Sequence, residues 1–145
     1  MACKSAQTEL PLLQNCPGSG DCEVQVFKET KLFIEEGSSG ISEVSFDEDS
    51  DFQVIFIQYK ESGKSKYMEE IYLQVPSRFR EIHSKNHSLQ NQKVVFGKIK
   101  EGEEAVFERI TKGVLQLINL KDFTSLRLEI KSEEPQVLKS IEIKI

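Results

Sequence analysis

Hydrophobic and polar residues alternate along most of the chain, as they do in strands that bury one face. Val24 and Val26 alternate with polar neighbours, and residues 141–145 near the other end repeat the same two-residue period. Between these ends, turn sequences rich in glycine, serine and charged residues recur roughly every 8–12 residues. The pattern predicts about ten short antiparallel strands and an all-β fold, a β-sandwich or barrel, with a β-trefoil as the alternative.

The most hydrophobic segment covers residues 52–59, where the run Val-Ile-Phe-Ile is apolar on both faces. Such a strand belongs in the middle of a covered sheet, so we expect Ile55 and Phe56 to be buried together. A hairpin turn at residues 60–64, with Gly63 free to take a positive φ, leads into a strand that Pro76 ends.

Two segments lack a strand pattern. Residues 77–92 contain Phe79 and Ile82 at three-residue spacing, which predicts one helical turn, followed by a polar loop. The acidic run from Asp47 to Asp51 is interpreted as a solvated loop, since runs of like charge repel one another and favour water.

Residues 1–21 differ from the rest in being rich in serine, glutamine, glycine and proline. They predict a flexible leader before a single all-β domain of residues 22–145, a length that suits one core. The three cysteines, Cys3, Cys16 and Cys22, lie in or beside this leader. Because an odd, crowded set is not a disulfide framework, we expect free thiols.

The charge balance bears on partners and location. The chain carries 24 acidic and 19 basic residues, a net charge of −5, whereas nucleic-acid and anionic-membrane binders carry a basic surplus. We therefore expect no nucleic acid partner, and no membrane insertion because no apolar run is long enough. Without a signal-peptide core the expected location is cytoplasmic, with secretion without a signal peptide as the alternative.

The sequence offers no catalytic or cofactor-binding motif. His83 and His87 stand four residues apart, but no third or fourth metal ligand accompanies them, and Ser84 replaces the glutamate of the zinc-protease motif. We therefore expect no enzyme, no cofactor and no metal bound by these histidines.

The acidic run also fails as an EF-hand. Counting from Asp47, the sixth position is Phe52 and the twelfth is Gln58, where glycine and an acid are needed. Whether the run from Asp47 to Asp51 holds calcium in a looser way, and whether the nearby serines Ser45 and Ser50 are phosphorylated, stays open.

Three segments resemble the interleukin-18 branch of the interleukin-1 cytokines. Residues 32–37, 46–51 and 55–62 fall in a similar order and spacing, within a region that covers about a third of the chain. The resemblance implies a β-trefoil cytokine made without a signal peptide, whose leader is removed by cutting after an aspartate. Asp21 would suit that cut, and a cell-surface receptor would be the partner.

Two functional hypotheses follow. The first is a non-catalytic protein–protein interaction domain, adaptor or regulatory, that binds another protein through a sheet face, edge or loop. Residues 137–145 are predicted to be an exposed edge able to accept a partner strand. The alternative is the leaderless interleukin-1-like cytokine. Neither hypothesis fixes the partner's identity or the oligomeric state.

Overall fold

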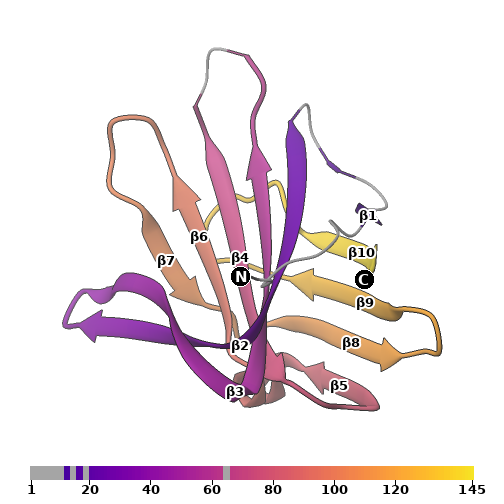
Figure 1. The fold of residues 1–145 in the computed structure, drawn as a ribbon. Helices are drawn as coiled ribbons and strands as arrows, with labels where there is room; N and C mark the ends of the chain where they lie inside the picture. Colours follow the sequence, from indigo (N-terminus) through magenta and orange to yellow (C-terminus); the bar gives the residue numbers. More distant parts are fainter. Residues whose placement is uncertain (1–11, 14–15, 18–19, 64–65) are drawn as a thin grey trace, which may run out of the picture.

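The computed structural model describes residues 12–13, 16–17, 20–63 and 66–145. Within them the chain forms ten strands and one short 3-10 helix, η1 (Asn86–Asn91), and the strands make two five-stranded antiparallel sheets. In Figure 1 the strands of one sheet run across those of the other. The predicted all-β fold of about ten strands, sandwich or barrel, is confirmed.

One sheet has the order β1-β10-β9-β8-β5. Its strands are β1 (Leu12–Leu13), β10 (Ser140–Lys144), β9 (Thr124–Ile130), β8 (Gly113–Asn119) and β5 (Glu81–Lys85). Alternate residues of these strands turn one face to the core, as the two-residue period requires. That buried face includes Ile82, Leu115, Leu117, Leu126, Leu128, Ile141 and Ile143.

The other sheet has the order β2-β3-β4-β6-β7. Its strands are β2 (Asp21–Gly37), β3 (Gly40–Lys60), β4 (Met68–Pro76), β6 (Val94–Ile99) and β7 (Val106–Arg109). Ile41 near the start of β3 also pairs with Phe107 of β7, so the sheet curls until its two sides meet. Gly97 on β6 is opposite Phe107 in the register and leaves room for its ring, because a Cβ there would lie 2.7 Å from it.

The core has two parts, one on each side of β4. Ile71, Leu73 and Val75 pack into the larger cluster between the sheets, whereas Tyr72 joins a smaller cluster inside the curl of the second sheet. All of residues 69–75 are buried. β4 is therefore the strand that is covered on both faces.

The prediction for residues 52–59 is correct in part. Ile55 is buried, but Phe56 is only half-buried, because it faces the inside of the curl rather than the space between the sheets. The strand that is covered on both faces is the next one, β4. Its buried polar residues interrupt the apolar pattern, so the sequence did not identify it as the central strand.

Two predicted boundaries are wrong. Residues 77–92 contain a strand, β5, and the 3-10 helix η1 in place of a helical turn and a loop. Short strands expected on either side of the acidic run are instead parts of β3, which is 21 residues long, paired with the 17-residue β2. The acidic run itself lies within β3 and is not a loop.

The predicted edge strand is also different. Only Ser140–Lys144 form β10, and this strand lies between β9 and β1, with Leu13 paired to Ile143 and Leu12 to Lys144. β1 therefore covers this edge at Ile143 and Lys144, and residues 137–139 lie outside the strand. Among the described strands, β5 is the outermost strand of the first sheet on the side opposite β1. In the second sheet, β2 is the outermost strand on the side opposite β7.

Cys16 and Cys22 form a disulfide, with 5.6 Å between their Cα atoms, where free thiols were expected. Cys3 lies outside the described residues. Cys16 and Cys22 pair although the total number of cysteines is odd, so the odd total was the wrong criterion. Residues 1–11 of the predicted leader are outside the described residues too, and the leader with its boundary at residue 21 stays a prediction.

Among the helices in the described parts, none is long and apolar enough to cross a membrane.

Candidate functional site

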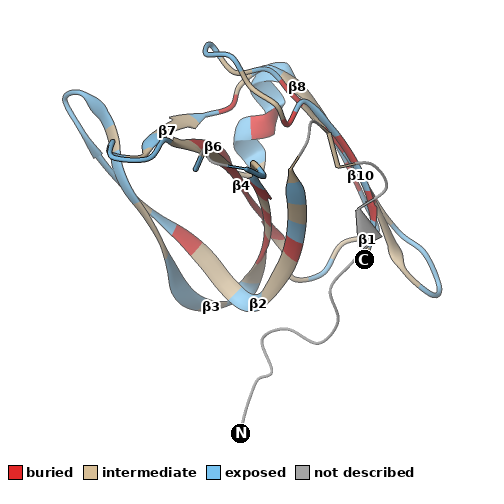
Figure 2. Ribbon diagram, turned by 90° about the horizontal axis from the view of Figure 1, so that it is seen from above, coloured by how far each residue is buried: buried red, intermediate tan, exposed pale blue. Residues whose placement is uncertain are grey.

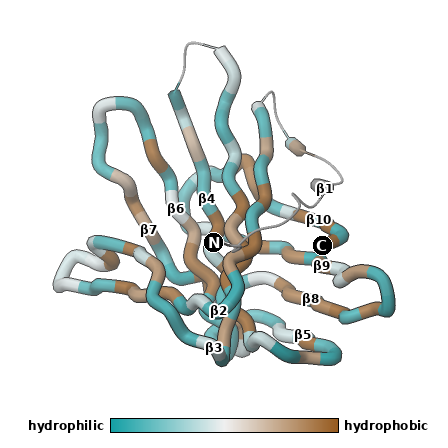
Figure 3. Tube along the Cα trace, viewed as in Figure 1, coloured by the Kyte–Doolittle hydropathy of each residue, from teal (hydrophilic) through white to brown (hydrophobic). Residues whose placement is uncertain are grey.

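The β2–β3 hairpin extends beyond the body of its sheet as an arm, which we define as residues 29–51. The arm lies below β6 and β7 in Figure 1. Most of its residues are exposed or half-buried (Figure 2). Hydrophobic and hydrophilic positions alternate along it (Figure 3). The arm thus has an inner face toward the curl and an outer face toward solvent.

Bulges at both ends of the arm set its direction. Lys28 pairs with Gln53 but Thr30 pairs with Glu48, so the single residue Glu29, with φ of 51°, faces four residues of β3. A second irregularity lies between Glu35 and Glu36. Bulges bend the strand that carries them and increase its twist, which accounts for the turn of the arm away from the sheet.

The acidic run forms the corner at the base of the arm. The Asp49 carboxylate accepts the backbone N–H of Asp51 at 2.9 Å, an arrangement that favours a turn. Across the corner, the backbone N–H of Ser77 donates to the carbonyl of Asp51 at 2.8 Å, and its hydroxyl donates to the carbonyl of Ser50 at 2.7 Å. These bonds explain why the run is ordered as part of β3.

The outer face of the arm centres on Phe33. Phe33 is 46% exposed and pairs with Ser45 across the hairpin. On the same face, two residues away along each strand, lie the pairs Lys31–Asp47 and Glu35–Glu43. Phe33 is therefore an apolar side chain surrounded by charged ones, three of them carboxylates.

The arm holds more than the whole net negative charge of the chain. Residues 29–51 contain eight acids and one lysine, a net charge of −7, whereas the full chain carries −5. All other residues together therefore carry +2. The charge that distinguishes this protein is concentrated on one hairpin.

The inner face of the arm contacts a group of aromatic rings, although its own ring, Phe46, is 41% exposed. Phe46 lies 4.8 Å from Phe27 and 6.0 Å from Tyr72, ring centre to ring centre, and Tyr72 in turn contacts Phe56 at 5.0 Å and Phe107 at 6.2 Å. Offset and tilted pairs at such distances stabilise one another beyond simple burial. The arm is thus docked on the sheet through its inner face.

Two polar contacts fix the arm further. The side-chain oxygen of buried Gln74 accepts the backbone N–H of Leu32 at 2.7 Å. Near the hairpin turn, Arg109 on β7 donates to the Glu36 carboxylate at 2.7 Å. The hydrogen bond and the charge of Arg109 lower the pKa of Glu36 below its usual value.

Two buried carboxylates lie next to each other on β4 and face opposite sides. Glu70 accepts the Tyr72 hydroxyl at 2.7 Å and the Gln58 amide at 3.0 Å, within the curl. Burial, followed by the hydrogen bond and charge of Glu70, raises the pKa of Tyr72. The Glu70 carboxylate therefore accepts hydrogen bonds from two neutral donors. It holds Tyr72, a ring that the inner face of the arm contacts.

Glu69, which is fully buried, joins the two sheets. Its carboxylate accepts the backbone N–H groups of Val137 and Leu138, both at 2.7 Å, and the Tyr67 hydroxyl at 2.5 Å. Burial, and then the hydrogen bond to Glu69, raises the pKa of Tyr67. Glu69 therefore fixes the segment between β9 and β10 against the other sheet.

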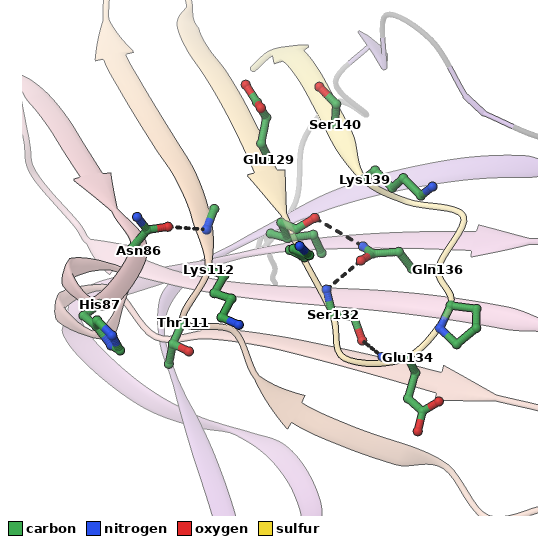
Figure 4. Close-up of a pocket in the computed structure, with 14 residues that line it drawn as sticks. Asn86, His87, Thr111, Lys112, Glu129, Ser132, Glu134, Gln136, Lys139 and Ser140 are labelled. Carbon is green, nitrogen blue, oxygen red and sulfur yellow. Dashed lines mark hydrogen bonds between the residues drawn. The ribbon is translucent and has the colours of Figure 1, made fainter.

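An open groove of about 860 Å³ lies between this segment and the start of β8 (Figure 4). Its lining mixes signs, with Lys112, Lys131 and Lys139 against Glu129 and Glu134. Several polar side chains in it bond to the protein's own backbone, whereas the Ser132 hydroxyl donates to the Glu108 carboxylate and Glu129 pairs with Arg127. Gln136, for example, accepts from Ser132 and donates to Leu138, and Asn86 accepts from Gly113. These side chains hold the walls of the groove together.

The two histidines are not brought together on a helix. His83 is on β5, with its ring 3.1 Å from the Glu81 carboxylate, and His87 is in η1 at the groove. In the described part of the chain, no three side chains of histidine, cysteine, aspartate or glutamate gather where they could hold a metal ion.

Reasoning from sequence missed Phe33 as a surface residue. Its signal was present in the run Leu32-Phe33-Ile34, because the middle residue of three consecutive apolar residues in a strand must face the opposite side from its neighbours. The pairing of Glu35 with Glu43 needed the register of the hairpin, which the sequence does not show. No family model, curated protein or solved structure matches the chain.

Proposed function

We propose that this is a non-catalytic domain that binds another protein through the outer face of the arm. The observation that carries the proposal is the exposure of Phe33 at the centre of a charged strand pair. Aromatic side chains within a polar rim are typical anchors of protein interfaces, and they supply affinity out of proportion to their number.

The rigidity of the arm supports the same function. Its inner face is packed against Tyr72 and Phe27, its base is hydrogen-bonded to Ser77, and its end is tied to Arg109. A partner that binds a surface already held in place loses less conformational entropy than one that orders a loop. The outer face is therefore suited to recognition.

The disulfide bears on where this binding takes place. Disulfides persist in oxidising compartments and are rare in the cytosol. The Cys16–Cys22 bond thus favours the alternative in which the domain acts outside the cell, as a secreted cytokine-like protein would, over the cytoplasmic adaptor. The binding surface proposed is the same in both cases.

Site-specific cross-linking tests the proposal. A photo-activated residue in place of Ser45, which faces Phe33 across the hairpin, should cross-link a protein from cells or culture medium. The matched control places the same residue at Glu142 on the exposed side of β10, in the other sheet. Recovery of the same proteins from both positions, or of none from Ser45, would overturn the proposed surface.

A further inference from the structure

Glu35 and Glu43 are directly opposite each other on the outer face of the arm, beside Phe33. Directly opposed side chains in an antiparallel pair have Cβ atoms about 5 Å apart, and like charges at this position oppose the pairing of the strands. Both residues are exposed. The hairpin therefore contains a repulsive contact at the place where the apolar anchor lies.

Among the described residues, no cation pairs with Glu35 or Glu43 to relieve this repulsion. The ion pairs that involve the arm join Lys31 to Asp49 and Arg109 to Glu36, and none of the ion pairs in the described part of the chain includes Glu35 or Glu43. Asp47, the third carboxylate of the face, is also in none of them, although it is opposite Lys31 in the register. The face has carboxylates that are available to an external cation.

Building on the proposed function, we infer that the partner inserts a lysine or arginine side chain between Glu35 and Glu43, with an adjacent apolar side chain on Phe33. A basic, partly apolar protein segment is complementary to this face in both respects. Two carboxylates at this spacing suit a guanidinium or ammonium group, whose donors reach both. The excess charge of the arm, −7, also speeds the encounter with a basic partner.

The probe for the test is a synthetic peptide in which lysine alternates with valine, compared with its glutamate–valine counterpart. Binding to the full chain is measured by calorimetry at low and high salt. The lysine peptide should bind, the glutamate peptide should not, and salt should weaken the binding because the charges are exposed.

Two variants with the same change in net charge provide the control. One is Glu35→Gln with Glu43→Gln and Asp47→Asn on the arm, and the other is Glu101→Gln with Glu103→Gln and Glu104→Gln at the turn before β7. The arm variant should lose about tenfold or more in affinity for the lysine peptide, and the turn variant about twofold or less. Equal losses in the two variants would mean attraction to net charge alone and would overturn the inference.

A stability measurement separates this role from a structural one. Because the opposed carboxylates repel, the arm variant should melt at the same temperature as the wild type or higher, while its binding falls. The inference and the proposed function fail in different ways. If the protein cross-linked at Ser45 binds the arm variant as tightly as the wild type, the function stands and the cationic contact is wrong.

Discussion

Glu35 and Glu43 face each other across the β2–β3 hairpin, two carboxylates in direct opposition on its exposed side. Strand pairs are usually stabilised by opposite charges at this position, as in the pair Arg127–Glu142 of β9 and β10. At the position of Glu35 and Glu43, the outer face of the arm lacks the opposite charges that stabilise the pair in β9 and β10.

Neutralising one member of the opposed pair should therefore stabilise the domain. We expect Glu43→Gln to raise the free energy of unfolding by about 0.2–1 kcal/mol, because it removes a repulsion and leaves the strand pairing intact. Urea unfolding followed by circular dichroism measures the change. The control, Glu142→Gln, removes an attraction to Arg127 and should lower stability slightly. A loss of stability in both variants would contradict this reading of the register.

Glu69 should be the most sensitive polar residue of the core. Glu69→Ala leaves the buried backbone N–H of Leu138 and the half-buried one of Val137 without an acceptor, and each unsatisfied buried group costs about 1–3 kcal/mol. We expect a loss of about 3 kcal/mol or more in the free energy of unfolding, against less than about 0.5 kcal/mol for the exposed Glu103→Ala. Similar small effects from both would show that Glu69 does not join the sheets.

The ion pair at the end of the arm should depend on pH in a defined direction. The pKa of Glu36 is lowered in the folded chain by Arg109, so the pair stabilises the arm above the usual carboxyl pKa near 4.5. This contribution is lost as the pH falls through the lowered pKa. In a carboxyl NMR titration, Glu36 should titrate below 4.5, and Arg109→Gln should return it to the usual value. An unchanged titration in that variant would contradict the contact.

The disulfide should contribute measurably to stability. Cys16 and Cys22 are six residues apart, and closing a loop of this size in the unfolded chain is worth about 2 kcal/mol in the chain-entropy account. Reduction should lower the free energy of unfolding by about that amount. A variant with both cysteines replaced by serine should start lower and should not respond to the reductant.

Much of the fold follows from the sequence because burial on one face imposes a period of two residues. The strands of the first sheet, such as β9 and β10, show that period plainly, and their hydrophobic residues are those that are buried. Prediction failed where polar residues are inside. Glu69, Glu70 and Gln74 interrupt the apolar pattern of β4 although each is buried and hydrogen-bonded.

The candidate site was hidden for a different reason. The acidic run was interpreted as a loop because like charges repel, but Asp49 uses its carboxylate to form the corner of β3, and Ser77 completes it. The partner of a strand residue depends on bulges, such as the one at Glu29, that have no reliable sequence signal. The opposition of Glu35 and Glu43 therefore becomes visible only in three dimensions.

The most direct test of the account is the affinity of a Phe33→Ala variant for the protein that cross-links at Ser45. Phe33 is 46% exposed, so its removal should leave the melting temperature unchanged. Leu120→Ala is the matched control, since Leu120 is 48% exposed, on the loop between β8 and β9. We predict that Phe33→Ala weakens binding at least about tenfold, whereas Leu120→Ala does not. Equal affinity of Phe33→Ala and wild type, with the fold intact, would contradict the assignment of the arm as the binding surface.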